Sequence, residues 1–184
     1  MAERPDSRVT RGHLHYGRMN EPSHSLPPIR VLFVCLGNIC RSPLGEALFN
    51  HHAETGGLAE RFRVDSAGTA AYHVGEPPDR RSAETARRRG VRLSGRARRL
   101  EPEDYFDFDH IVAMDRENLA DILAARPEDA TATIHLLRSF DPRADGDHDV
   151  PDPYYGGPDG FDQVHDIVDR STRALLAHLA RESG

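Results

Sequence analysis

A cysteine and an arginine in a Cys-x5-Arg spacing, Cys35 and Arg41, give this sequence its strongest indication of chemistry. A thiol reacts as the thiolate, and a guanidinium can bind two oxygens of a phosphoryl group through its planar pair of donors. Between them, Gly37 and Asn38 tolerate the left-handed backbone that a loop needs when it turns its amides inward. Ser42 follows, where its hydroxyl can donate to the thiolate. The spacing indicates a nucleophile at the mouth of an anion-binding loop.

The segments on either side of this loop predict the elements that hold it. Residues 29–34 form a short apolar run rich in β-branched side chains, which is typical of a buried strand. A helix over about residues 43–54 follows, with Ser42 as its N-cap. Strand, tight loop and helix start would direct backbone N–H groups at one point, as in phosphate-binding loops. These amides, the helix dipole and Arg41 are expected to favour the thiolate of Cys35.

A plainer interpretation competes with this one. Most lone cysteines are small buried hydrophobic residues, and a bare Cys-x5-Arg spacing is common by chance. The strand before the cysteine, the Gly-Asn pair within the loop and the Ser-Pro pair after it favour the reactive interpretation of Cys35.

The chain resembles the low-molecular-weight protein tyrosine phosphatases of bacterial type. The resemblance rests on Cys-Leu-Gly-Asn-Ile-Cys-Arg-Ser-Pro at 35–43 and Asp-Pro-Tyr-Tyr at 152–155. Asp-Ser-Ala-Gly-Thr at 65–69 and Ala-Met-Asp at 113–115 are similar to strand ends of that family. It implies a catalytic domain over residues 29–184 that hydrolyses phosphotyrosine in proteins, and small aryl phosphates, through a cysteinyl-phosphate. No metal and no cofactor are expected, and phosphate or another oxyanion is the expected ligand.

The resemblance implies a role for each matching residue. Cys35 would be the nucleophile, Arg41 the phosphate clamp and Asp152 the general acid and base. The phosphate-binding loop would comprise Leu36, Gly37, Asn38, Ile39, Cys40, Arg41 and Ser42. The substrate slot would be formed by Leu36, Tyr72, Tyr154 and Tyr155. Spacing alone does not choose between Asp152 and the other aspartates of its loop, so that assignment depends on the resemblance.

Three further positions concern the loop itself. Ser66 matches the family serine that helps to hold the loop asparagine, here Asn38, in its strained conformation. Gly95 departs from the family, because many members carry a histidine there, and it leaves open how this chain fixes Asn38. Cys40 has two interpretations: a packed thiol, or a redox partner whose reversible disulfide with Cys35 would protect the nucleophile from over-oxidation.

Strand and helix patterns alternate along the rest of the chain. Further strands are predicted at 62–66, 110–114 and 134–137, and further helices at 79–89, 117–125 and 161–181. This alternation predicts a three-layer α/β/α, flavodoxin-like domain with a four-stranded parallel sheet in the order 2-1-3-4. Ligands bind such sheets at the carboxyl ends of the strands where the order reverses, which is where Cys35 falls.

The remaining segments suggest little chemistry. Residues 1–28 lack apolar periodicity and predict a disordered leader, and its histidines His13, His15 and His24 are not expected to bind metal. His51 and His52 are expected on the surface. The basic stretch over residues 80–99 is interpreted as a solvated helix face rather than a docking patch for acidic substrates.

Composition excludes several classes of protein. With 184 residues and a net charge of -6, the chain suits a single domain that does not bind nucleic acid. It has no apolar run long enough to span a membrane and no secretory signal, so no membrane partner is expected. Its two cysteines favour a reducing, cytoplasmic compartment.

Three alternative functions are disfavoured. Thioredoxin-coupled arsenate reductases have a similar loop but need further cysteines downstream, and none follows Cys40. A phosphotyrosine-binding module without chemistry would need neither Cys35 nor Asp152. An arginine patch that binds nucleic acid lacks interleaved aromatic residues and a basic net charge.

Overall fold

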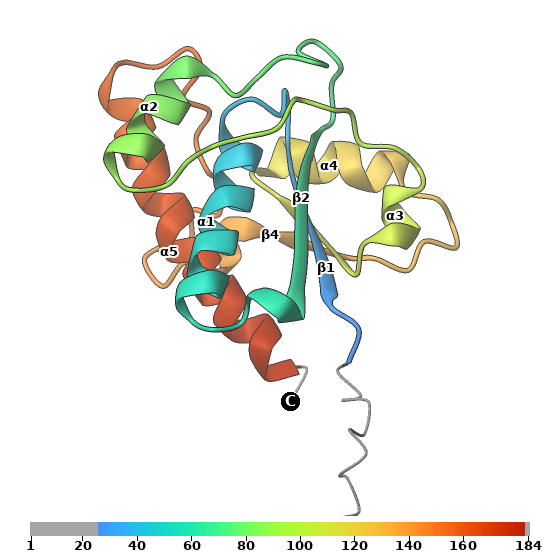
Figure 1. Cartoon of the computed structure of the whole chain (residues 1–184). Coiled ribbons are helices and arrows are strands. Elements are labelled where there is room, and N and C mark those ends of the chain that lie inside the picture. Colours follow the sequence, from blue (N-terminus) through green and yellow to red (C-terminus); the bar gives the residue numbers. More distant parts are fainter. Residues whose placement is uncertain (1–25, 183–184) are drawn as a thin grey trace, which may run out of the picture.

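A computed structural model describes residues 26–182 and arranges them in three layers, α/β/α (Figure 1). One sheet of four parallel strands lies in the middle, in the order β2-β1-β3-β4. Its strands are β1 (Ile29–Cys35), β2 (Phe62–Gly68), β3 (His110–Ala113) and β4 (Thr133–Leu136). The predicted order and class are therefore confirmed. Most of the predicted leader, with its three histidines, lies outside the described residues.

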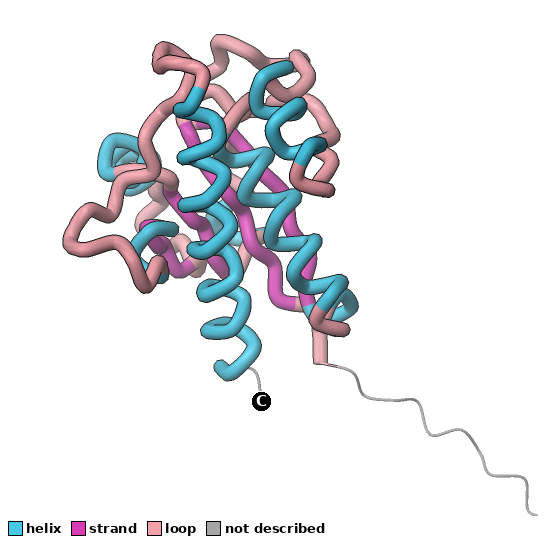
Figure 2. The backbone as a smooth tube through the Cα atoms, turned by 90° about the vertical axis from the view of Figure 1, so that its left-hand side faces the viewer, coloured by secondary structure: helices cyan, strands magenta, loops and turns pink. Residues whose placement is uncertain are grey.

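The helices cover both faces of this sheet. Helices α1 (Arg41–Thr55), α2 (Arg80–Arg88) and α5 (Asp159–Glu182) lie on one side, and α3 (Asp104–Asp107) and α4 (Arg116–Ala125) on the other (Figures 1 and 2). Two short 3-10 turns, Ala59–Arg61 and Leu137–Phe140, complete the described elements. The predicted long helices are confirmed to within two residues. The short α3 was missed, because a single turn is too brief to show a helical period.

β1 is buried on both of its faces, which explains its unbroken apolar sequence. Val31 and Phe33 pack toward α1 and α5, whereas Leu32 and Val34 pack toward α3 and α4. Helix α5 turns an apolar face toward the sheet, and the apolar residues of that face are all buried: Val164, Ile167, Val168, Leu175, Leu176 and Leu179. The central position of β1 fixes the height and direction of its last residue, Cys35.

Caps and glycines set several of the helix ends. Asp79 caps α2 by accepting hydrogen bonds from the amides of Arg81 and Ser82, and Asp115 caps α4 in the same way. Gly57 and Gly90 follow α1 and α2 with φ of 70° and 82°, the left-handed conformation that ends helices.

Two local predictions were wrong. Ser42 is not the N-cap of α1, which begins one residue earlier; the cap position is Cys40, with no side-chain hydrogen bond, and the hydroxyl of Ser42 serves the thiol instead. His52 is not on the surface. It is buried where α1 packs against α5, and its Nε2 lies 3.1 Å from a carboxylate oxygen of Asp169.

The arginines of α2 are largely paired. Arg87 pairs with Glu84 one turn away, and Arg88 and Arg89 both reach Asp162 on α5. These pairs neutralise most of the positive charge at the end of α2, and the interpretation of residues 80–99 as a solvated helix face stays a prediction. No helix among residues 26–182 has the length and apolar character that crossing a membrane requires.

Candidate active site

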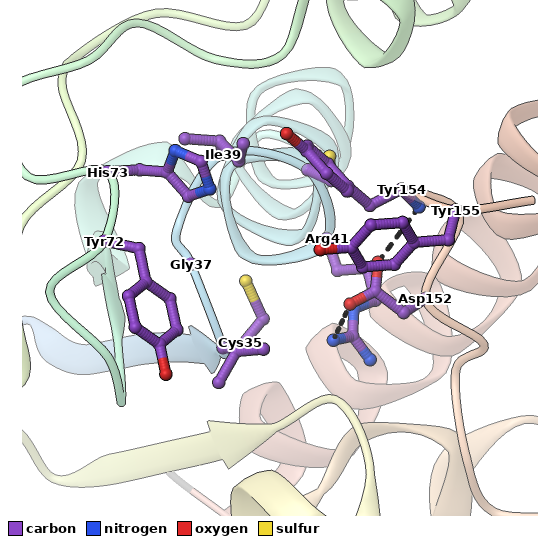
Figure 3. Close-up of a pocket in the computed structure, with 11 residues that line it drawn as sticks. Cys35, Gly37, Ile39, Arg41, Tyr72, His73, Asp152, Tyr154 and Tyr155 are labelled. Atoms are coloured by element: carbon purple, nitrogen blue, oxygen red, sulfur yellow. Dashed lines mark hydrogen bonds and ion pairs between the residues drawn. The ribbon is translucent and has the colours of Figure 1, made fainter.

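The predicted nucleophile ends the central strand. Cys35 is the last residue of β1, which lies between β2 and β3 in the sheet. The chain then turns through residues 36–40 into α1. Its side chain lines a cavity of about 100 Å³ at the carboxyl edge of the sheet (Figure 3). The position agrees with the rule that ligands of parallel sheets bind where the strand order reverses.

Most predicted site residues meet in this cavity. Besides Cys35 they are Leu36, Gly37, Ile39, Cys40, Arg41, Tyr72, Asp152, Tyr154 and Tyr155. The other three, Asn38, Ser42 and Ser66, are buried close behind it. His73 also lines the cavity and was not singled out from the sequence. It follows Tyr72 in an irregular loop, where no periodic signal marks its direction.

The hydroxyl of Ser42 lies beside the thiol. Its Oγ is 3.0 Å from Cys35 Sγ and 3.3 Å from the carbonyl oxygen of Ala67, and it accepts a hydrogen bond from the side-chain Nδ2 of Asn38. A hydroxyl has one proton to donate. With a thiolate the proton can point to sulfur, and with a thiol it can point to Ala67 while the S–H donates to Ser42. The site therefore accommodates both charge states of Cys35.

Backbone amides of the loop are available to an anion. The N–H groups of Gly37, Asn38, Ile39 and Cys40 donate to no acceptor among the described residues. Buried amides are rarely left without a partner, and a run of them at the start of a helix is a ready site for a phosphoryl group.

The left-handed residue of the loop is Asn38, with φ of 55°. Its side-chain Nδ2 donates to Ser66 Oγ at 3.0 Å as well as to Ser42, and its Oδ1 accepts from the backbone N–H of Arg98 at 2.9 Å. These bonds answer the question that Gly95 raised, since a backbone amide supplies the support. Gly37 does not adopt a positive φ, and its small size matters instead, because a Cβ there would lie 2.9 Å from the ring of His73.

A carboxylate that the sequence analysis missed continues this network. Ser66 donates to Glu46 Oε2 at 2.7 Å, and Glu46 lies on α1 directly behind the loop. Burial raises the pKa of the Glu46 carboxyl above its usual range, although the bond from Ser66 opposes this shift. Its place one helical turn after Ser42 was the signal in the sequence that could have indicated it.

Arg41 is 2% exposed and is held by three acceptors. One terminal nitrogen donates to Asp115 and to the carbonyl oxygen of Val150, and the other donates to Asp152 Oδ2 at 3.0 Å. Burial opposes its charge, but Cys35, Asp152 and Asp115 outweigh burial and raise the pKa of Arg41. Asp115 is also the N-cap of α4. It has both functions, because its second oxygen accepts from the amide of Asn118.

Asp152 enters the site on an exposed arm. Its side chain is 38% exposed, and its Oδ1 accepts from the amide of Tyr154 at 3.1 Å, which fixes a local turn. The rings of Tyr154 and Tyr155 meet edge to face with centroids 4.8 Å apart. Figure 3 shows these rings on one side of Cys35 and Tyr72 on the other. A flat group that entered between them would reach the sulfur.

The second thiol, Cys40, is buried in the same cavity wall. Burial, reinforced by Asp79, raises the pKa of Cys40 well above that of an ordinary thiol. Cys40 therefore stays protonated at neutral pH and does not compete with Cys35 for the phosphoryl group. Among residues 26–182 no group of three or more His, Cys, Asp or Glu side chains is placed to hold a metal ion.

The site combines a thiol, loop amides without an acceptor among the described residues, a buried guanidinium and a carboxylate. It lies where the strand order of a parallel sheet reverses. This combination is typical of a cysteine-dependent hydrolase of phosphoric monoesters. The model of the low molecular weight phosphotyrosine protein phosphatase family matches residues 30–184. The chain belongs to this family and is a protein-tyrosine-phosphatase.

Individual relatives agree with that assignment. A putative low molecular weight protein-tyrosine-phosphatase of Synechocystis is 46% identical over 156 residues, which cover 84% of this chain and 98% of the relative. The low molecular weight phosphotyrosine protein phosphatase of Homo sapiens is 43% identical over 148 residues, which cover 79% and 92%. The crystal structure of a protein tyrosine phosphatase from Entamoeba histolytica, with Hepes in its active site, has a TM-score of 0.80 at 36% identity and covers 85% of this chain and 99% of that one.

Proposed function

We propose that this protein removes phosphate from phosphotyrosine in proteins, and from small aryl phosphates, through a cysteinyl-phosphate. The observation that supports this most directly is the meeting of Cys35, Arg41 and Asp152 in one cavity. A binding module would need the amides and the arginine, but neither a thiol nor a carboxylate at that place.

The first step is an in-line displacement at phosphorus. The thiolate of Cys35 forms the S–P bond while the bond from phosphorus to the phenolic oxygen breaks, and Asp152 gives its proton to that oxygen. Arg41 and the loop amides stabilise the charge that spreads over the other three oxygens. A phosphoryl group bound to Arg41 would take over the nitrogen that donates to Asp152. Binding of substrate would thus release the carboxyl group toward the leaving oxygen.

The second step hydrolyses the intermediate. Asp152, now a carboxylate, takes a proton from water; the water oxygen bonds to phosphorus and the S–P bond breaks. Ser42, 3.0 Å from the sulfur, donates to the departing thiolate. Phosphate leaves and Asp152 is protonated again. In this scheme Arg41 and the amides supply the positive field, so the reaction requires no metal and no cofactor.

The walls of the cavity suit an aromatic ester. Leu36 and the rings of Tyr72, Tyr154 and Tyr155 border the entrance, and an aryl ring gains more from such contacts than a short alkyl chain. We therefore assign phosphotyrosine proteins as partners and phosphate or another oxyanion as ligand, with no role for nucleic acid or a membrane. The two free thiols suit a reducing, cytoplasmic compartment.

Purified protein with p-nitrophenyl phosphate tests this function. We expect turnover that EDTA does not reduce, a loss of about 10⁴-fold or more in Cys35→Ser, and a smaller loss in Asp152→Ala. Cys40→Ser is the matched control, because it alters a thiol in the same wall and should retain at least a tenth of the activity. Turnover that survives Cys35→Ser, or that needs an added metal, would rule out the mechanism.

Cys40 has a proposed second role as a redox partner. Peroxide would oxidise the Cys35 thiolate to a sulfenic acid, and Cys40 would then displace water to form a disulfide, losing its proton in that step. A dithiol would restore both thiols. After peroxide and then dithiothreitol, the wild type should recover most of its activity and Cys40→Ser much less. Equal recovery would leave Cys40 as a packed thiol.

A further inference from the structure

A second hollow lies next to the active-site cavity and shares two of its lining residues, Leu36 and Tyr72. Its volume is about 630 Å³. The other residues that line it come from the loop after β2 (69–71), from Arg99 and Leu100, and from Asp121, Ala124 and Ala125 of α4. We call this hollow the flank groove.

The walls of the flank groove are fixed to the phosphate loop. The amide of Thr69 donates to the carbonyl oxygen of Cys35, and the amide of Ala70 donates to that of Leu36, both at 2.9 Å. The amide of Leu100 donates to the carbonyl oxygen of Gly68 at 2.8 Å. These backbone bonds fix the position of the groove relative to the nucleophile before any ligand binds. Binding there therefore costs little conformational entropy of the protein.

Seven of the ten residues that line the groove are leucine, alanine or tyrosine, and the lining has no net charge. Leu36 is 39% exposed and Tyr72 is 77% exposed, and both rank among the few large apolar side chains that the described residues leave uncovered. Arg99 and Asp121 carry opposite charges, and the side chain of neither has a hydrogen-bond or ion-pair partner among residues 26–182. Exposed apolar side chains in a concave surface leave water when an apolar group packs on them, which favours binding.

We propose that the flank groove binds the peptide segment next to the phosphotyrosine and favours an apolar side chain there. This inference rests on the proposed function. A phosphotyrosine ring between Tyr72 and the Tyr154–Tyr155 pair places the peptide backbone at the mouth of the cavity. One exit from that mouth passes over Leu36 and Tyr72 directly into the groove. The balanced charges of Arg99 and Asp121 give no preference for an acidic neighbour, so selection depends on apolar area.

The experiment uses phosphotyrosine peptides in a serine background, with a single leucine moved through the three positions on each side of the phosphotyrosine. We expect leucine at one position to raise kcat/KM about fivefold over serine. In Ala124→Trp, which fills the groove from α4, the leucine-to-serine ratio should fall to about one. Leu123→Trp is the matched control, since Leu123 is an exposed neighbour on the same helix that does not line the groove, and it should keep the ratio.

The ratio is the readout because it does not depend on how much of a variant is correctly folded. A ratio near one at every position in the wild type, or a fivefold ratio that persists in Ala124→Trp, would overturn the proposal. Turnover of p-nitrophenyl phosphate by the wild type tests the proposed function separately. Titration of the same peptides into Cys35→Ser measures the leucine preference by binding alone, so the groove stays testable if turnover fails.

Discussion

The phosphate loop (residues 35–42) and the acid arm (residues 141–158, between the last 3-10 turn and α5) are held in opposite ways. The side chains of Cys35, Asn38, Arg41 and Ser42 in the loop are buried. Hydrogen bonds join Cys35 and Asn38 to Ser42, and Arg41 is held by acceptors outside the loop. The acid arm is anchored at Val150, whose amide donates to the carbonyl oxygen of Met114 and whose own carbonyl oxygen accepts from Arg41. Past Val150, Arg41 donates to Asp152 and Arg81 donates to the carbonyl oxygen of Tyr154.

Beyond that anchor the arm is much more exposed. The side chain of Asp152 is 38% exposed, and Tyr155 is 93% exposed. The contrast suits two different tasks. Charge stabilisation at phosphorus depends on donors that are already in place, whereas a group that protonates the leaving oxygen and then activates water must change partners. The rigid region holds the phosphoryl group, and the adaptable region moves the protons.

Arg41→Lys tests the rigid side most severely. An ammonium group cannot reproduce the planar fork, and it leaves acceptors of Asp115, Val150 and Asp152 without donors. We expect kcat/KM to fall about 10³-fold and the free energy of unfolding to fall by about 2–3 kcal/mol. Steady-state kinetics and urea unfolding measure the two effects. Arg30 forms a surface ion pair with Asp109, and Arg30→Lys should change neither kcat/KM nor the free energy of unfolding appreciably. An Arg41→Lys enzyme within tenfold of the wild type would mean that the loop does not depend on the fork.

Asp152→Asn tests the adaptable side. The amide keeps the shape of the carboxylate but transfers no proton, so kcat for phosphotyrosine should fall about 10²-fold. The loss should be smaller with p-nitrophenyl phosphate, because nitrophenolate leaves without a proton. Thermal stability should hardly change, since the side chain is partly exposed. Asp149→Asn, on the same arm and paired with Arg116, serves as the control for activity. A large fall in melting temperature in Asp152→Asn would mean that the acid arm is as firmly fixed as the phosphate loop.

Asn38→Ala and Asn38→Gly together separate the hydrogen bonds of the loop from its backbone conformation. Both remove the bonds to Ser42, Ser66 and the amide of Arg98, but only alanine also strains a φ of 55°. We expect the free energy of unfolding to fall by about 3 kcal/mol in the alanine variant and by about 2 kcal/mol in the glycine variant. In both variants kcat should be about tenfold lower. Urea unfolding and kinetics decide the matter. Equal stability of the two variants would show that the backbone is unstrained.

Acidification should act on the fold at a distance from both regions. Burial, helped by His110 and His178, lowers the pKa of His135 to about 4 from an ordinary value of 6.5. The unfolded chain therefore binds more protons between these values. Stability from this group is complete above pH 6.5 and is lost as the pH falls toward 4. Partial exposure limits the loss to about 1–2 kcal/mol.

Urea unfolding at pH 7.5 and pH 4.5 measures that loss. His135→Leu should reduce the dependence, whereas His51→Leu, at an exposed position, should leave it unchanged. A wild-type stability that does not vary over this range would contradict the burial argument. Kinetic measurements at low pH need this stability measurement beside them, because activity reports on the site only where the fold is intact.

The sequence predicted best what depends on neighbouring residues. The central strand, the loop and the capped helices follow from local apolar runs, glycines and aspartates, and the sheet order follows from their alternation. Choosing Asp152 from its loop needed the resemblance to a family. What was missed depends on contacts across the fold. Glu46 meets Ser66, Asp115 meets Arg41, and His52 lies under α5 only because distant segments pack together.

The central place of β1 has a consequence for how enzyme activity arises during folding. Arg41 must find Asp152 at a separation of 111 residues, and Arg30 at the start of β1 meets Asp109 at a separation of 79. Parallel pairing of this kind has a high contact order and forms slowly. Helices can therefore be present in a refolding chain well before a single ester bond is cleaved. Recovery of turnover therefore measures when the whole domain has folded. A ribosome-bound chain that ends before the acid arm can contain folded helices and strands but cannot catalyse the reaction.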